Sequence, residues 1–353
     1  MTQPTSLNAT FDTSLIDLSP PSQDHLSDTG YSSTVADSFS TTASDQPVTG
    51  QPSGGLLPGS IDITTPTLSK ASKTSSIPVP MSGEPPATPP SGSSGQSKPV
   101  KYVPTVDAYD AWASVYDSDG NILQAIDDLE LTSLLPKFLG LVTSALQGEK
   151  ELRITDLGCG TGRNTLKLAA YAYPAGVKAV RVTGVDASGG MLEVARRKFA
   201  ELPLNSAGLD VAAEFVQYDL LSPASGSTLP EPSHAVISTL VLEHIPLSTF
   251  FNATRALLLP GGMALVTNMH PQMGGMSQAG FVAEDGTKVR GTSWVYGVEE
   301  TVQGARAAGL ELVGEVRERS VSEEMVERGM VGKRGRKWVG VRVWYGFVVR
   351  RVG

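Results

Sequence analysis

Residues 151–168 read ELRITDLGCGTGRNTLKL. The apolar side chains of Ile154 and Leu157 predict the end of a buried strand, and the pattern from Thr165 onward predicts a helix. The glycines between them let the backbone turn tightly, and the free N–H groups at the start of the helix can meet an anionic or polar ligand. This stretch therefore predicts a nucleotide-binding corner.

The spacing of the glycines narrows the choice of ligand. It is G-x-G-x-G, with Asp156 two residues ahead of the first glycine. Dinucleotide-binding dehydrogenases use G-x-G-x-x-G without that leading acid. The loop spacing therefore disfavours a dehydrogenase.

A second acid ends the next predicted strand in VRVTGVDASGGMLEVARRK. Asp186 follows Gly162 by 24 residues, close to the interval of about 20 residues at which an acid meets ribose hydroxyls in a strand-helix-strand unit. Ala187 and Met191 are then placed to line an adenine ring. In the alternative interpretation, Asp186 only belongs to a helix cap together with Ser188.

Two further motifs end at the same predicted edge of the sheet. EFVQYDLLS places Asp219 at the carboxyl end of a strand, where ligands bind in open α/β sheets. HAVISTLVLEHIP is a nearly continuous apolar run, as expected for a central strand buried on both faces. Leu240 lies at its exit and His244 follows. His244 either faces the reacting group or packs in the core.

The order of these motifs resembles that of class I S-adenosylmethionine-dependent methyltransferases, and the resemblance covers roughly residues 105–350. It implies S-adenosyl-L-methionine as the cofactor, with Asp219 and the backbone of Leu220 at the adenine and Leu240 beneath the methionine part. The other residues that it implies as cofactor contacts are Asp156, Gly158, Cys159, Gly160, Gly162, Asp186, Ala187 and Met191.

Two aromatic segments flank the predicted cofactor site in sequence. The first resembles a Tyr-Asp-x-Trp-Ala-x-x-Tyr-Asp segment of similar enzymes, which implies that Tyr116 covers the cofactor carboxylate and that Tyr109 and Trp112 shape the acceptor pocket. The same spacing also fits the hydrophobic stripe of a helix. The second segment is an insertion over residues 271–298, with a hairpin tip at Asp285, and long insertions of this kind often serve as lids.

The insertion resembles a subgroup of small-molecule methyltransferases that combine a strand-five histidine with Gln-Ala-Gly-Phe and a Ser-aromatic pair. Here the histidine is His270, and the resemblance implies substrate contacts for residues of the insertion. Alternatively, the aromatics only pack the hairpin. The predicted substrate residues of the insertion are Gln278, Phe281, Ser293, Trp294 and Tyr296.

Composition divides the chain near residue 100. The first 100 residues contain 21 Ser, 14 Thr and 14 Pro, with no Trp, Cys or Arg. Such a segment cannot bury enough apolar area to offset an ordering entropy of roughly 1 to 2 kcal/mol per residue, so a disordered tail is predicted. It carries 3 Lys against 8 acids, which is −5 of the overall net charge of −8. Protein partners of the tail are conceivable, but neither part has the positive field that nucleic acid requires.

The remaining residues, 101–353, suffice for one methyltransferase domain. The resemblance implies that its fold class is α/β: a Rossmann-like, seven-stranded, mostly parallel sheet with an antiparallel edge hairpin formed by strands near 310–316 and 341–349. No apolar run approaches the length of about 20 residues that spans a membrane. With Cys159 as the single cysteine, neither a disulfide framework nor a metal site is expected. A cytoplasmic location is expected, with a nuclear one as the alternative.

The predicted function is methyl transfer from S-adenosylmethionine to an acceptor, with a small molecule favoured. A catalytically silent cofactor-binding subunit and a protein methyltransferase are the alternatives. If the acceptor is a hydroxyl group, His244 or His270 is the candidate proton acceptor. An amine that arrives neutral, or a thiolate, needs no such base.

Overall fold

The computed structural model describes residues 10–11, 100–146, 148–204, 208–283 and 285–353. The predicted disordered tail, residues 1–100, lies outside the described residues apart from 10–11 and 100.

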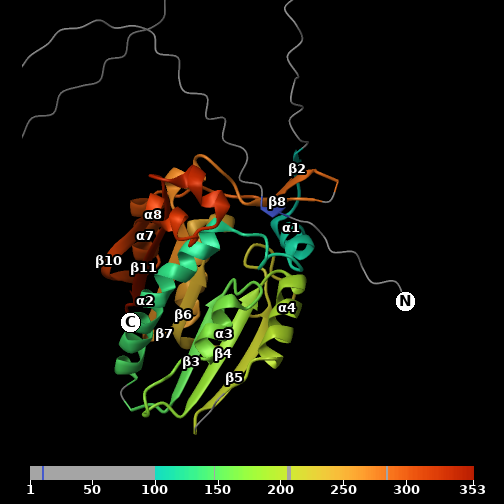
Figure 1. Ribbon diagram of the computed structural model, residues 1–353. Helices are drawn as coiled ribbons and strands as arrows, with labels where there is room; N and C mark the ends of the chain where they lie inside the picture. Colours follow the sequence, from blue (N-terminus) through green and yellow to red (C-terminus); the bar gives the residue numbers. More distant parts are fainter. Residues whose placement is uncertain (1–9, 12–99, 147, 205–207, 284) are drawn as a thin grey trace, which may run out of the picture. The chain divides into compact units, whose positions relative to one another are not determined.

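A seven-stranded sheet forms the centre of the described part of the chain (Figure 1). The strand order is β10-β11-β7-β6-β3-β4-β5, and β11 runs antiparallel to both of its neighbours, whereas the other pairs are parallel. The predicted Rossmann-like α/β fold with an antiparallel edge pair is therefore confirmed. The strands are β3 (Glu151–Leu157), β4 (Ala179–Asp186), β5 (Asp210–Gln217), β6 (Ser233–Thr239), β7 (Leu258–Met269), β10 (Leu310–Ser320) and β11 (Arg342–Arg351).

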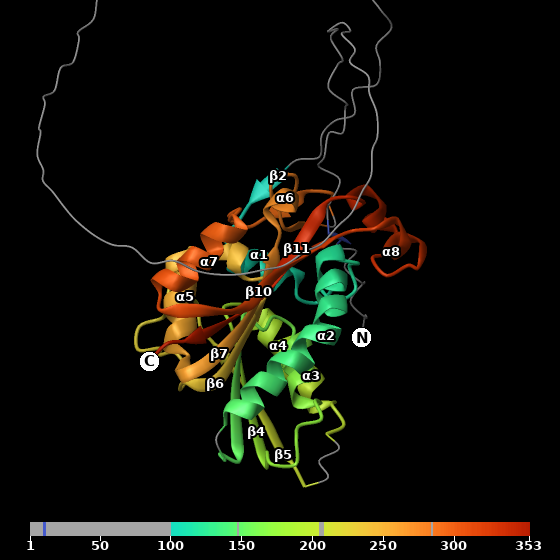
Figure 2. The same ribbon diagram turned by 90° about the vertical axis from the view of Figure 1, so that its left-hand side faces the viewer.

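Helices cover both faces of this sheet, and Figure 2 shows α5 and α7 on the side opposite to α2 and α3. Each face buries its own apolar cluster, one beneath α2 and α3 and one beneath α5 and α7. Because both faces are covered, the central strand β6 is buried almost throughout, as its sequence predicted. The helices are α2 (Ile122–Ala145), α3 (Arg163–Ala169), α4 (Gly189–Ala200), α5 (Leu247–Ala256) and α7 (Val298–Ala307).

A smaller sheet and a short helix lie at one end of the large sheet (Figure 1). The helix is α1 (Thr105–Trp112), and the small sheet has the order β1-β8-β9-β2. β8 and β9 pair antiparallel, which confirms the hairpin predicted within residues 271–298. The remaining elements are β1 (Thr10–Phe11), β2 (Val100–Tyr102), β8 (Gly280–Val282), β9 (Lys288–Arg290), α6 (Pro271–Gly274), α8 (Glu323–Glu327) and the 3₁₀ helices η1 (Leu242–His244) and η2 (Lys333–Trp338).

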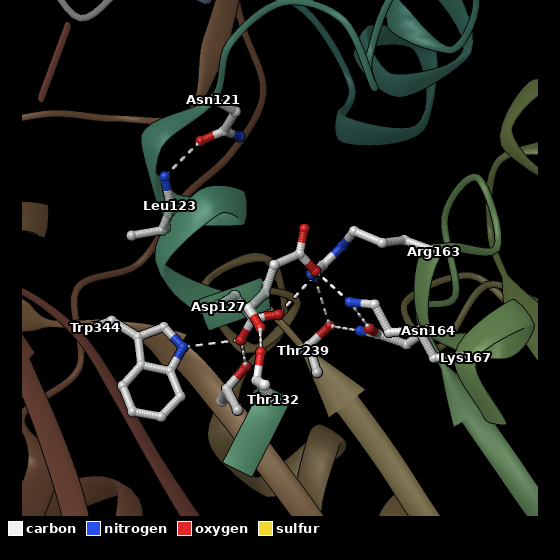
Figure 3. Close-up of polar contacts among 11 residues, drawn as sticks. Asn121, Leu123, Asp127, Thr132, Arg163, Asn164, Lys167, Thr239 and Trp344 are labelled. Atoms are coloured by element: carbon white, nitrogen blue, oxygen red, sulfur yellow. Dashed lines mark hydrogen bonds and ion pairs between the residues drawn. The ribbon is translucent and has the colours of Figure 1, made fainter. Parts of the chain in front are cut away.

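A buried carboxylate on α2 joins several of these elements (Figure 3). Asp127 is fully buried and accepts hydrogen bonds from Thr267 of β7 at 2.6 Å and from the indole N–H of Trp344 of β11 at 2.8 Å. Its other oxygen pairs with Arg163 of α3 at 2.6 Å. Arg163 also reaches Thr239 at the end of β6, at 3.2 Å. The pairing of this one charge therefore fixes α2 and α3 against the sheet.

Asp127→Asn should lower the free energy of unfolding by about 3 to 5 kcal/mol, because the guanidinium of Arg163 loses its buried, negatively charged partner. Asp128 offers a matched control, since it also pairs with Arg163 but its side chain is 45% exposed, against 0% for Asp127. Asp128→Asn should therefore cost less than about 1 kcal/mol. Urea denaturation of both variants measures the difference, and equal losses would contradict the role given to Asp127.

Candidate functional site

The glycine loop between β3 and α3 adopts a backbone that only glycine takes without strain. Gly158, Gly160 and Gly162 have φ of +72°, +54° and +79°. A Cβ on Gly158 would lie 2.3 Å from the side chain of Val241, whereas a Cβ on Gly160 would meet no atom within 4 Å. The loop is thus packed at Gly158 and open at Gly160, which leaves room for a ligand beside the backbone.

The end of β6 carries a second unusual backbone. Leu240 is the single non-glycine residue with positive φ in the described part of the chain, at +59°. Its N–H donates to the carbonyl of Thr267 at 2.9 Å, which holds the conformation. Strained residues of this kind cluster at ligand sites. Leu240 and Gly160 both face the same cavity.

The carboxylate of Asp186 lies between the glycine loop and α4. One oxygen accepts the backbone N–H of Gly160 at 2.8 Å, and the other accepts that of Ser188 at 2.9 Å. Burial raises the pKa of Asp186, while these two hydrogen bonds oppose the shift. Ser188 caps α4 through its own hydroxyl group. Asp186 thus fixes the turn and also lines the cavity.

The cavity has a volume of about 360 Å³ and lies at the carboxyl ends of the parallel strands, where open α/β sheets bind ligands. It brings together residues from both predicted aromatic segments and from the strand ends. The predicted residues on its wall are Tyr109, Tyr116, Gly158, Gly160, Asp186, Ala187, Met191, Asp219, Leu220, Leu240, His244 and Trp294.

Three predicted cofactor residues do not lie on this wall. Asp156 points into α3 and accepts the hydroxyl of Thr165 at 2.6 Å, and burial raises its pKa to about 6. Cys159 is buried, and burial raises the pKa of its thiol. Gly162 caps α3 and packs against Ala195. In this structure these three residues support the glycine loop on the side that does not face the cavity.

His270 lies away from the cavity. Its Nε2 pairs with Glu318 of β10 at 2.9 Å, and its Nδ1 accepts the backbone N–H of Gln272 at 3.0 Å as the cap of α6. Both ring nitrogens are therefore engaged on the far side of β7. The structure thus does not bring His270 to the cavity, although its position at the end of β7 predicted that it would be there.

Most of the other predicted substrate residues also lie off the main wall. Phe281 stacks on Trp112 with ring centroids 5.6 Å apart, and the amide of Gln278 donates to the carbonyl of Gly291 at 2.9 Å. Tyr296 donates to the carbonyl of Ile245 at 3.2 Å. Ser293 is partly exposed and is not on the wall. These aromatic side chains pack the insertion against its neighbours.

Tyr109 and His244 form a hydrogen-bonded pair at the cavity. Nδ1 of His244 lies 2.9 Å from the carbonyl oxygen of Thr292, so this nitrogen carries the proton. Burial lowers the pKa of His244, which keeps the ring neutral. Nε2 is then the acceptor for the hydroxyl of Tyr109, at 2.8 Å. The pair offers a proton acceptor with a defined tautomer.

The sequence prediction missed the contacts that hold α1 over the cavity. Asp110 accepts hydrogen bonds from the hydroxyl of Ser188 and, at 2.9 Å, from the backbone N–H of Gly190 at the start of α4. At the other end of α1, Thr105 bonds to the backbone of Thr292, accepting its N–H at 3.1 Å. An Asp directly after Tyr109 carries no distinctive spacing, so only the fold reveals these contacts.

Residues 154–262 match the methyltransferase domain family. The chain is also 46% identical, over 266 residues, to an uncharacterised methyltransferase of Emericella nidulans, with 70% of this chain and 91% of that protein covered. This chain belongs to the methyltransferase family. It is a class I, S-adenosylmethionine-dependent enzyme, as the order of its sequence motifs predicted.

Among solved structures, this methyltransferase is similar to magnesium protoporphyrin IX methyltransferase from Synechocystis with bound SAH, at 17% identity, with a TM-score of 0.44 and with 69% of this chain and 94% of that chain covered. It is also similar to an S-adenosylmethionine-dependent methyltransferase from Mesorhizobium loti, at 20% identity and a TM-score of 0.38, with 60% of this chain and 96% of that chain covered.

Among the described residues of this methyltransferase, none of the helices combines the length and the apolar character that a membrane span requires.

The acids of the first two motifs, Asp156 and Asp186, give a test of cofactor binding. Asp186→Asn should weaken S-adenosylmethionine binding by roughly ten- to a hundredfold, because a charge-assisted hydrogen bond contributes about 1.5 to 3 kcal/mol. Asp156→Asn is the matched control, and its effect on affinity should stay within about threefold, since it faces α3. Calorimetric titration of both folded variants measures this. An unchanged affinity in Asp186→Asn would contradict the assignment.

Proposed function

We propose that this methyltransferase holds S-adenosylmethionine at the carboxyl edge of β3, β4 and β5 and methylates a small molecule beside Tyr109 and His244. Asp186 is the ribose contact, Asp219 and Leu220 flank the adenine, and the open face of Gly160 lies beneath the methionine part. The observation that carries the proposal is the position of the Tyr109–His244 pair on the same cavity wall as Asp186 and Gly160.

The segments that cover the cavity, α1 and the insertion, favour a small molecule as the methyl acceptor. α1 is fixed to α4 through Asp110 and to the insertion through Thr105 and Thr292. The insertion is fixed in turn, because the backbone N–H of Trp294 donates to the carbonyl of Glu243 at 2.7 Å. Tyr109 and Trp294 are thereby held over the cavity. A cover of this kind excludes water and leaves room for a compact ligand.

The residues around Tyr109 and His244 have complementary tasks in the proposed methyl transfer. When bound, the sulfonium of the cofactor supplies an electrophilic methyl group. Alignment of the acceptor by the cavity wall accounts for most of the rate gain, since positioning can supply about 7 to 11 kcal/mol. For a hydroxyl acceptor, Tyr109 takes the proton of the acceptor as it gives its own proton to the neutral Nε2 of His244. The carbonyl of Thr292 then stabilises the positive charge on the ring through Nδ1–H.

The proposal also divides the chain into a folded domain and a tail. Residues 101–353 form the methyltransferase domain, with the insertion near 271–298 as part of its cover, and residues 1–100 form a tail that is dispensable for cofactor binding. We also place the protein in the cytoplasm or nucleus, because its single cysteine suits a reducing compartment.

The nature of the acceptor can be tested without knowing its identity. The protein is incubated with methyl-labelled S-adenosylmethionine and a cell extract separated by size. Label should enter the small-molecule fraction. Label in proteins would instead support a protein acceptor, and cofactor binding without any labelled product would support a silent subunit.

Tyr109→Phe and His244→Gln should both lower turnover of the labelled small molecules and leave cofactor affinity within about threefold of the parent. The loss for His244→Gln should reach about 10² to 10⁴ if the acceptor is a hydroxyl, the usual range for a general base. Tyr296→Phe is the control, because Tyr296 does not line the cavity and its hydroxyl donates to the backbone carbonyl of Ile245. Full activity in His244→Gln would remove this residue from the proton transfer.

A further inference from the structure

A second, smaller cavity lies behind the aromatic wall of the first. Its volume is about 20 Å³, enough for one group of the size of a water molecule. Tyr109, Tyr116 and Leu240 line both cavities, so the two share a wall. Glu243 and Trp112 line the small cavity alone.

Glu243 brings into this cavity a carboxyl oxygen without a hydrogen-bond partner among the described residues. The residue is 3% exposed, and its Oε2 has no hydrogen-bond partner in the described part of the chain. The backbone N–H of Met269 donates to the carboxyl group. Oε1 lies 3.8 Å from Nε2 of His244, which is too far for a hydrogen bond. A buried acceptor oxygen without a partner is destabilising, so a ligand that supplies a donor relieves this cost when it binds.

Three aromatic rings contact one another around this carboxyl group. The ring centroids of Trp112 and Tyr116 are 4.9 Å apart, those of Tyr109 and Trp112 are 5.8 Å apart, and those of Tyr109 and Tyr116 are 5.9 Å apart. Aromatic rings attract cations through their faces, and sets of them recognise alkylammonium groups. Aromatic rings together with a carboxylate form a site for an organic cation.

The groups that face Glu243 provide no competing positive charge. They are Tyr109 of α1, Tyr116 of the following turn, His244 of η1 and Tyr345 of β11. None of the described lining residues of the small cavity is Lys or Arg. Burial raises the pKa of Glu243 to about 8, so the empty cavity holds a neutral carboxylic acid near pH 7.

We propose that the small cavity binds the protonated amino group of the methyl acceptor, with Glu243 as its counter-ion and Tyr109, Trp112 and Tyr116 around it. This rests on the proposed function, since it specifies the small molecule as an amine. The ammonium group is an anchor and not the methylated atom, because a protonated nitrogen has no free electron pair. The methylated atom lies across the shared wall, beside Tyr109 and His244.

The arrangement makes cation binding depend on pH. An entering ammonium group favours the ionised form of Glu243, so binding releases one proton whenever the empty site is protonated. The affinity should therefore rise by about tenfold per pH unit from pH 6 to about 8 and level off above that. A neutral ligand of the same shape gains nothing from the carboxylate and should show no such dependence.

The experiment uses the full chain saturated with S-adenosylhomocysteine, and calorimetric titration with methylammonium chloride or with methanol as the neutral probe. Methylammonium should bind, and titrations in buffers of different ionisation enthalpy at pH 7 should show the release of about one proton. Glu243→Gln should weaken methylammonium binding by about tenfold or more at pH 8. Glu193→Gln, at an exposed position on α4, is the matched control and should bind like the parent.

Two results would overturn the proposal: methylammonium and methanol binding alike at pH 8, or binding of methylammonium by Glu243→Gln at parental affinity. The comparison with methanol needs no variant, so it remains decisive even if Glu243→Gln does not fold. None of these titrations depends on turnover. Failure here is therefore separate from failure of the small-molecule assignment, which is read from the labelled extract.

Discussion

The charge on Asp127 constrains the structure around it more than any other group in the described part of the chain. A carboxylate without access to water must be paired, and its partners come from α3, β7 and β11. Arg163, the partner on α3, is the residue directly after Gly162. The ion pair therefore sets where α3 begins, and with it the position of the glycine loop that faces the cavity.

Three acids lie at the carboxyl ends of successive strands, yet their surroundings give them different tasks. Asp156 is buried behind the loop and bonds to Thr165. Asp186 bonds to Gly160 and Ser188 and remains on the cavity wall. Asp219 accepts the N–H of Leu221 at 2.8 Å and shapes its own turn. The same place at a strand end thus provides a loop support, a residue of the cavity wall and a turn, depending on which donors the fold brings near.

Local pattern predicted the strands and the hairpin in the insertion, because strand periodicity and turn residues are properties of neighbouring residues. The edge pair and much of the cavity wall followed from the resemblance to the methyltransferase family. Local pattern could not predict contacts between residues that are far apart in the sequence. The packing of Trp112 against Phe281, the pairing of His270 with Glu318 and the network of Asp127 each depend on how separate elements approach one another. Glu243 stands next to the predicted His244, but nothing in its spacing signals a second cavity.

Burial shifts the pKa values of two adjacent residues in opposite directions. It lowers the pKa of His244 and raises that of Glu243, so both side chains are neutral near pH 7. The cover formed by α1 and the insertion produces this burial, through Asp110 and Thr105. Water entering beneath α1 would move both pKa values back toward their ordinary range. The basicity of His244 and the closure of the cavity are therefore consequences of the same contacts.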